Sequence, residues 1–154
     1  MKFNKIIFII LFCLIFFVNK AFSKENKIIL KLNNEIITTV DILNEIKFLS
    51  IMNSEFKNIE KNKKIEIAKN SLIKQKIKFI EISKFKKNIY LEDNIFENIV
   101  LNYYKNLNID NIKNLEIFFT RENLNMEFIR EKISINTYWN QLIYKKFIKN
   151  IKIN

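Results

Sequence analysis

The residue types that most often do chemistry in proteins are scarce in this chain. The 154-residue sequence contains no histidine, no glycine and one cysteine. Histidine is the commonest general base and metal ligand, so its absence argues against most acid–base centres and against zinc or copper sites. Without glycine, the chain also lacks the glycine-rich loops that bind nucleotide phosphates. The sequence therefore predicts no cofactor and no metal.

Carboxylates are the remaining candidates for acid–base work. Glu92, Asp93 and Glu97 are spaced so that they meet across one turn of a helix. Acidic residues also favour the first turn of a helix because they interact with its macrodipole, and this simpler role is the better interpretation here. Because the sequence offers no stronger cluster, we predict no catalytic residues and a protein that is not an enzyme.

The elements that would position binding residues begin with a hairpin. Residues 27–42 read KIILKLNNEIITTVDI, in which two apolar runs flank the pair Asn33–Asn34. Asparagine tolerates the left-handed backbone of tight hairpin turns, so we expect a strand, a turn and a second strand. Thr38 or Thr39 is the expected N-cap of the helix that follows. Thr38 and Asp41 have the spacing of a capping box.

Apolar residues at three- and four-residue spacing predict five helices after the hairpin. The first is expected to end near residue 52, the second to span about 60–86, and the third to begin near 93. Asp110 is the expected cap of a short fourth helix, and Asn125 of a fifth that runs to about residue 149. The predicted fold class is therefore mainly α, a small domain of about five helices with an N-terminal β-hairpin.

The first residues have the pattern of a cleaved secretory signal peptide. Lys2 and Lys5 precede the apolar run 6–18, and Ala21–Ser23 supplies the small residues that signal peptidase reads. The run is shorter than the roughly 20 residues that span a bilayer. We therefore predict a signal peptide at residues 1–23 and an exported domain at 24–154. The alternative is an uncleaved anchor, which would make the chain a membrane-anchored structural or interaction protein.

The positive charge does not predict a nucleic-acid partner. The formal net charge is +11, but lysines are scattered over every predicted helix, in a composition typical of a genome rich in A and T. Nucleic-acid binding needs a basic patch with arginine or aromatic readers, and export argues against it. A membrane-surface role is better because basic amphipathic helices bind anionic lipid. Against that role, several aromatic residues lie where a core would use them: Phe118, Phe119, Tyr138, Trp139, Tyr144 and Phe147.

Three stretches in order carry a likeness to a known family. They read KIILKLNNEIITTVDILNEIKFL from residue 27, IAKNSLIKQKI at 67–77 and LNMEFIREKISINTYWNQLIYKKF at 124–147. Together they resemble the N-terminal domain of the SurA-type periplasmic chaperones and peptidyl-prolyl isomerases, over essentially all of 27–150. Isomerase activity in that family belongs to parvulin domains with histidines and glycine-rich strands, which this sequence lacks. The resemblance therefore implies the chaperone module without isomerase activity.

The resemblance also implies a partner and a location. The family's N-terminal module binds unfolded outer-membrane proteins, so it implies a periplasmic holdase for unfolded outer-membrane or envelope proteins. Family members cover the opening hairpin with a C-terminal segment. Without that cover, the strand edge is expected to pair with a client strand, with a second subunit or with the chain's own tail. The expected peptide-binding residues are Phe48, Phe56, Tyr103, Tyr104, Phe118, Tyr138 and Tyr144.

Overall fold

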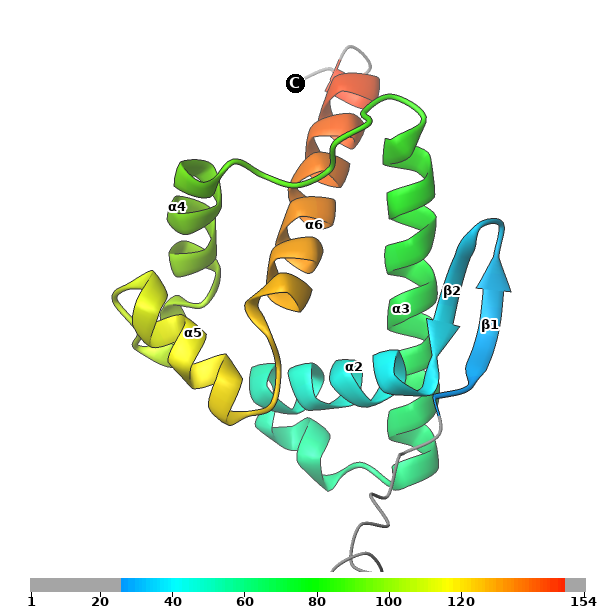
Figure 1. Ribbon diagram of the computed structural model, residues 1–154, viewed down its shortest axis with the longest axis vertical. Helices are drawn as coiled ribbons and strands as arrows, with labels where there is room; N and C mark the ends of the chain where they lie inside the picture. The colour runs from blue at the N-terminus through cyan, green and yellow to red at the C-terminus, as the bar shows by residue number, and fades with distance from the viewer. Residues whose placement is uncertain (1–25, 149–154) are drawn as a thin grey trace, which may run out of the picture.

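The fold consists of helices preceded by one hairpin. The computed structural model describes residues 26–148, so the predicted signal peptide at 1–23 lies outside the described residues. The elements in chain order are β1 (Ile28–Leu32), β2 (Glu35–Thr38), α2 (Thr39–Met52), η1 (Ser54–Asn58), α3 (Lys61–Ser83), α4 (Asp93–Tyr103), η2 (Lys105–Leu107), α5 (Ile112–Arg121) and α6 (Met126–Phe147). Within the described range, five α-helices and one antiparallel hairpin confirm the predicted fold class (Figure 1).

The hairpin and the start of α2 form by local interactions. Asn33 occupies the turn with a φ of 53°, in the left-handed region, and Leu32 pairs with Glu35 across it. The Thr38 hydroxyl accepts a hydrogen bond from the Asp41 N–H at 3.3 Å, and the Asp41 carboxylate accepts one from the Thr38 N–H at 2.7 Å. The predicted turn and the predicted capping box at Thr38 are both confirmed.

The caps of the last two helices differ in how well the sequence predicted them. Asn125 caps α6 as predicted, because its side-chain oxygen accepts from the Phe128 N–H at 2.9 Å. The prediction of Asp110 as the cap of α5 is wrong. Asn111 holds that position and accepts from the Asn114 N–H at 2.8 Å. Asp110 instead accepts a hydrogen bond from the Asn111 side chain at 2.9 Å, which orients the residue that does the capping.

The two long helices α3 and α6 lie side by side and form the frame of the molecule (Figure 1). Helix α2 crosses near one end of both, and the hairpin lies on the side of α3 that faces away from α6. Helices α4 and α5 flank α6 on its other side. The loop 84–92 runs from α3 past α6 to α4, and α6 holds it. The Leu91 N–H donates to the Ser134 hydroxyl at 3.2 Å, and Arg130 donates to the Leu91 carbonyl at 3.2 Å.

The core divides into three apolar clusters. The largest joins α2, α4, α5 and α6 around Phe96, Val100 and Phe119. A second joins the hairpin to α2 and α3, and its buried residues are Ile37, Ile42, Ala68 and Leu72. The third lies between α3, the loop 84–92 and α6, with buried Ile82, Ile89 and Ile135 and with partly buried Phe79, Tyr138, Trp139 and Leu142 packed against them.

The expectation that six aromatic residues belong to the core is correct for only part of the set. Phe119 is fully buried, and Phe118 packs partly buried against the same cluster. Tyr138 and Trp139 pack against the third cluster. Tyr144 and Phe147 are exposed by 63% and 45%, so for them the prediction is wrong. The last turns of α6 extend past the helices that would have covered these side chains (Figure 1).

Candidate functional site

The seven aromatic residues predicted to bind peptide do not form one groove. Phe48, Phe56 and Tyr104 are buried, so their rings stabilise the fold and are closed to a client. Tyr103 is exposed on α4, and Phe118 is partly buried on α5. The remaining two, Tyr138 and Tyr144, lie on α6.

Apolar side chains gather instead where α3 and α6 end together. We call this region the α3–α6 end surface and define it by Phe85, Tyr138, Trp139, Leu142, Ile143 and the lysines Lys86, Lys145 and Lys146. Tyr144 and Phe147 belong to the last turns of α6 but line neither hollow. It contains two open hollows. The larger measures about 440 Å³ and is lined by Ile82, Phe85, Lys86, Tyr138, Gln141, Leu142 and Lys145. The smaller measures about 370 Å³ and is lined by Glu81, Phe85, Trp139, Leu142, Ile143, Lys145 and Lys146.

The spacing of residues along α6 explains why there are two hollows. Tyr138, Leu142 and Lys145 follow one another at four and three residues and line the larger hollow. Trp139, Ile143 and Lys146 repeat the same spacing one residue later and line the smaller one. Each stripe thus runs from an aromatic ring on the third core cluster to a lysine in the last turn of the helix.

Phe85 lines both hollows. The sequence did not predict it as a binding residue. Helix α3 ends at Ser83, not near residue 86 as expected, so Phe85 leaves the helical face and stands 75% exposed. Its backbone is held, because its N–H donates to the Ile82 carbonyl at 2.9 Å. The amphipathic pattern of α3 gave no signal for Phe85, because the residue lies beyond the helix.

The end surface is positively charged. The segments 81–88 and 141–148 hold five lysines and one glutamate. The glutamate, Glu81, pairs with Lys84 at 2.6 Å. Lys86 lies with its ammonium 4.6 Å from the centroid of the Tyr138 ring, and Lys146 lies 5.7 Å from that of Phe147. Both ammonium groups therefore lie within cation–π range of an aromatic ring.

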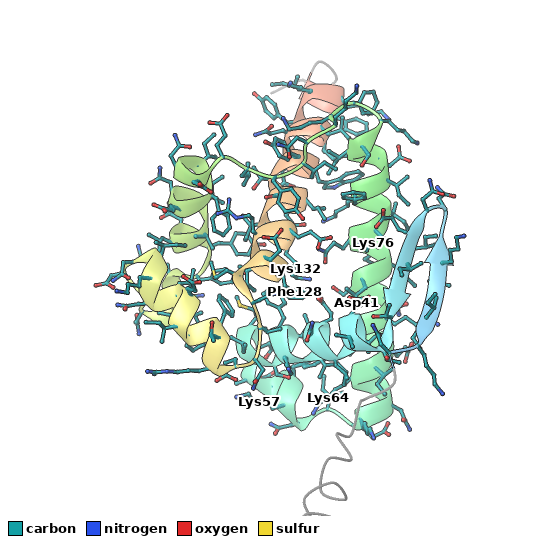
Figure 2. All side chains as sticks on the ribbon, viewed as in Figure 1. Asp41, Lys57, Lys64, Lys76, Phe128 and Lys132 are labelled. Atoms are coloured by element: carbon teal, nitrogen blue, oxygen red, sulfur yellow. The ribbon has the colours of Figure 1, made fainter. Side chains whose placement is uncertain are left out.

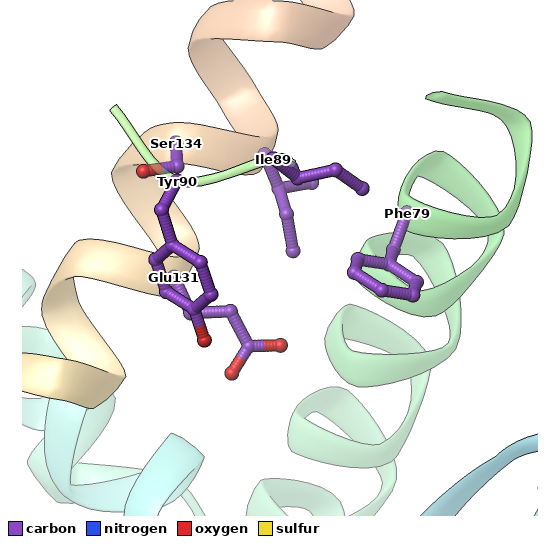
Figure 3. Close-up of a pocket in the computed structure, with 6 residues that line it drawn as sticks. Phe79, Ile89, Tyr90, Glu131 and Ser134 are labelled. Carbon is purple, nitrogen blue, oxygen red and sulfur yellow. The ribbon is translucent and has the colours of Figure 1, made fainter. Parts of the chain in front are cut away.

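A smaller pocket opens further along the same pair of helices. It measures about 190 Å³, and Figure 3 shows Phe79 from α3 and Ile89 from the loop facing each other across it. Glu131 lines it but is engaged by Lys76 at 3.5 Å, and Lys76 also binds Glu35 of β2 at 3.0 Å. Burial alone would lower the pKa of Lys76, but these two carboxylates outweigh it and raise the pKa above its ordinary value. Lys76 therefore links the hairpin, α3 and α6. Because Glu131 is paired with it, the carboxylate that lines the pocket is not available to a ligand.

A buried ion pair lies near the other end of α6. Glu45 of α2 and Lys132 of α6 are both buried and meet at 2.6 Å. The Ser71 hydroxyl donates to Glu45 at 2.7 Å, and Lys132 also donates to Gln75 at 2.9 Å. Figure 2 shows Lys132 beside Phe128, with the ammonium 5.3 Å from the ring centroid. Because both charges are satisfied and closed to solvent, this pair joins three helices and is not a reactive site.

Sequence reasoning missed that pair, although a signal was present. Glu45 lies midway between Ile42 and Phe48 at three-residue spacing, on the face of α2 that is buried. A charged residue within an apolar stripe indicates a buried charge, and a buried charge needs a partner. The partner is 87 residues away in the chain, so the sequence did not identify Lys132.

Among residues 26–148, no group of acidic or cysteine side chains lies close enough together to hold a metal ion. No helix in that range is long and apolar enough to cross a membrane.

Comparison with known proteins adds no relative: no protein-family model, no curated protein and no solved structure matches the chain. The resemblance to the SurA-type N-terminal domain therefore stays a prediction.

Proposed function

We propose that the protein is a non-enzymatic periplasmic holdase that binds unfolded outer-membrane or envelope proteins at the α3–α6 end surface. The observation that carries the proposal is a pair of adjacent open hollows that share the exposed ring of Phe85 and are lined on α6 by Tyr138, Trp139, Leu142 and Ile143. Single exposed apolar residues are normal on protein surfaces, whereas a contiguous and hollowed apolar patch marks a partner site.

The shape of the surface favours an extended polypeptide over a small molecule. The two hollows are open, lie side by side and share Phe85 and Leu142 as their common wall. Side chains on one face of an extended chain recur about every 6.6 Å, so neighbouring hollows suit alternate residues of a strand-like segment. Unfolded outer-membrane proteins are rich in such segments, since their strands alternate apolar and polar residues.

The expected binding is weak and needs no ATP. Burying one large apolar side chain contributes about 1.5–3 kcal/mol, and association itself costs several kcal/mol. Filling two hollows therefore supports an affinity that is roughly micromolar or weaker. Weak, reversible binding suits a protein that holds many clients briefly and releases them without nucleotide hydrolysis.

The alternative, a membrane-anchored structural or interaction protein, is favoured by one specific observation. Exposed aromatic residues mixed with lysines also suit an anionic membrane surface. The argument against that role was that the aromatics belong to a core, and it fails for Tyr144 and Phe147. Concave hollows favour side chains of a polypeptide, so we retain the holdase as the proposed function.

Trp139 supplies the test, because it is the only tryptophan in the chain and lines the smaller hollow. Titration of the purified protein with an unfolded, tryptophan-free outer-membrane protein should change Trp139 emission saturably. The substitution Phe85→Ser removes the ring that both hollows share and should abolish the change. Tyr103→Ser removes a comparably exposed aromatic from α4 and should leave the change intact. A saturable change in all three proteins would remove the assignment to this surface, and no change in the unmodified protein would remove the function.

A further inference from the structure

We infer that the α3–α6 end surface selects client segments in which an aromatic or large apolar residue stands within two residues of an aspartate or glutamate. This inference deepens the proposed function and rests on it. It names the chemistry of the client, a polypeptide segment that is both apolar and acidic.

The first observation is that both hollows combine apolar walls with lysines at one end. Tyr138 and Leu142 form the wall of the larger hollow and Lys145 its end. Trp139 and Ile143 do the same in the smaller hollow, which ends at Lys145 and Lys146. Successive members of each stripe are three or four residues apart, so they lie about 4.5–6 Å apart along the helix axis.

The second observation is that lysines line the larger hollow from two separate segments. Lys86 lines it from the loop after α3, and Lys145 lines it from α6. Lysines in the last turn of a helix also interact well with the helix dipole, which accounts for Lys145 and Lys146. Lys86 belongs to no helix, so the dipole does not account for it.

The third observation is the scarcity of compensating acid. Glu81 is the one carboxylate in the two segments 81–88 and 141–148, and it is paired with Lys84. Glu81 lines the smaller hollow, but its charge is balanced by Lys84, so Lys86, Lys145 and Lys146 leave an excess of positive charge around the two hollows. A carboxylate in the client supplies the complementary charge, and a client lysine or arginine is repelled.

The geometry of an extended chain links the two requirements. When an aromatic side chain enters a hollow, the residue two positions away lies on the same face, about 6.6 Å along the strand. The lysine side chains are long and flexible enough to reach over this range, and the Lys86 ammonium already lies 4.6 Å from the ring of Tyr138, which lines the larger hollow. One segment of client thus satisfies an apolar hollow and a lysine together.

The test measures binding of three fluorescein-labelled peptides of equal length by fluorescence anisotropy. One pairs phenylalanines with neighbouring glutamates, the second replaces the glutamates by lysines, and the third keeps the glutamates but replaces the phenylalanines by serines. We expect the first peptide to bind at least about fivefold more tightly than either other peptide. The preference should shrink in about 0.5 M salt, because the lysine–carboxylate pairs are exposed and therefore screened.

Matched lysine variants locate the preference. Lys145→Gln/Lys146→Gln should reduce the preference for the acidic peptide to about twofold or less while retaining binding of the phenylalanines. Lys105→Gln/Lys113→Gln removes the same charge from exposed positions in η2 and α5 and should change nothing. An equal loss in both variants would mean that net charge, and not this surface, sets the preference, and would overturn the inference.

Other outcomes separate the inference from the function on which it rests. Equal affinity for the acidic and basic phenylalanine peptides overturns the inference and leaves the holdase standing. Failure of every peptide to bind overturns both. A final experiment measures whether the protein sediments with phosphatidylglycerol vesicles. Binding to vesicles that is lost in Lys145→Gln/Lys146→Gln, without peptide binding, assigns the surface to lipid headgroups and overturns both proposals.

Discussion

At the scale of single residues, the most demanding interaction in the described fold is the pair formed by Glu45 and Lys132. Removing two charges from water is costly, and their attraction compensates only when the remaining polar atoms are also bonded. Ser71 and Gln75 meet that condition from α3. The pair therefore fixes how α2, α3 and α6 pack. Replacing one member should cost much more free energy of unfolding than replacing both.

Lys132→Met should lower the free energy of unfolding by about 3–5 kcal/mol, because it leaves Glu45 charged and buried without its partner. The double replacement Glu45→Leu/Lys132→Met should recover most of that loss. Lys63→Met, which breaks an exposed pair with Glu66, should cost less than about 1 kcal/mol. Urea denaturation monitored by circular dichroism gives all three values. A single replacement no more costly than the exposed control would show that the pair does not form in solution.

Tyr104 poses the opposite case, a buried polar atom with no partner. Its hydroxyl has no hydrogen-bond partner in the described structure, and its ring packs edge-on against Phe48 and Phe119. Tyr104→Phe should therefore keep the packing and raise the free energy of unfolding by about 1 kcal/mol. A loss of stability in the same denaturation experiment would show that the hydroxyl is bonded in solution.

The pH dependence of Tyr104 gives a second readout. Burial raises the pKa of Tyr104, because the phenolate is disfavoured away from water. The contribution of the neutral side chain to stability is full below about pH 10, the ordinary pKa of tyrosine, and is lost as the pH rises above it. Tyr104→Phe should thus lose stability less steeply than the unmodified protein above pH 10. Identical slopes would contradict the burial of this residue.

At the scale of elements, local signals were predictable and long-range partners were not. In a chain without glycine, asparagine takes the left-handed positions, and the structure finds it at Asn33, Asn108 and Asn123. The turn at Asn33 and the caps at Thr38 and Asn125 depend on neighbours within three residues, so the sequence predicts them. The partners of Lys76 lie on β2 and α6, far from it in the chain, and no periodicity within α3 indicates them.

The edge of β1 that does not pair with β2 is exposed and is open to pairing with a strand from another chain. Ile28 and Ile29 are exposed on it, while a register irregularity between Ile28 and Leu30 and the exposed Lys31 weaken any further pairing. Lys31→Val removes the charge that disfavours pairing of β1 with another strand. It should shift sedimentation velocity profiles at about 100 µM toward a dimer by strand pairing, whereas Lys57→Val on η1 should not. Unchanged profiles in both variants would argue against self-association through the hairpin.

At the scale of the whole molecule, the candidate site exists because elements differ in length. The spacing of Tyr138, Leu142 and Lys145 predicts a helix and an inner face, but it does not indicate where neighbouring helices stop. Helix α6 continues past α2, α4 and α5, and α3 ends at Ser83, so the same stripe is core at one end and surface at the other (Figure 1). The sequence therefore predicted what kind of side chains form the site, apolar and aromatic, but not where in the fold the site lies.

Export is the other prediction that concerns the whole chain. The apolar run 6–18 and the small residues before Lys24 predict removal of residues 1–23. Intact mass spectrometry of protein recovered from the periplasmic fraction should give the mass of a chain that begins at Lys24. A mass that includes Met1 to Ser23, in a membrane fraction, would favour the anchored alternative.

The central claim is that the α3–α6 end surface holds unfolded clients. The most direct measurement is light scattering after a urea-unfolded porin is diluted into buffer with a several-fold excess of the purified protein and no ATP. We predict slower and smaller scattering with the unmodified protein and with Tyr103→Ser, and scattering as in buffer alone with Phe85→Ser. Equal scattering with and without the unmodified protein, or equal suppression by all three proteins and by an unrelated basic protein of similar size, would contradict the claim.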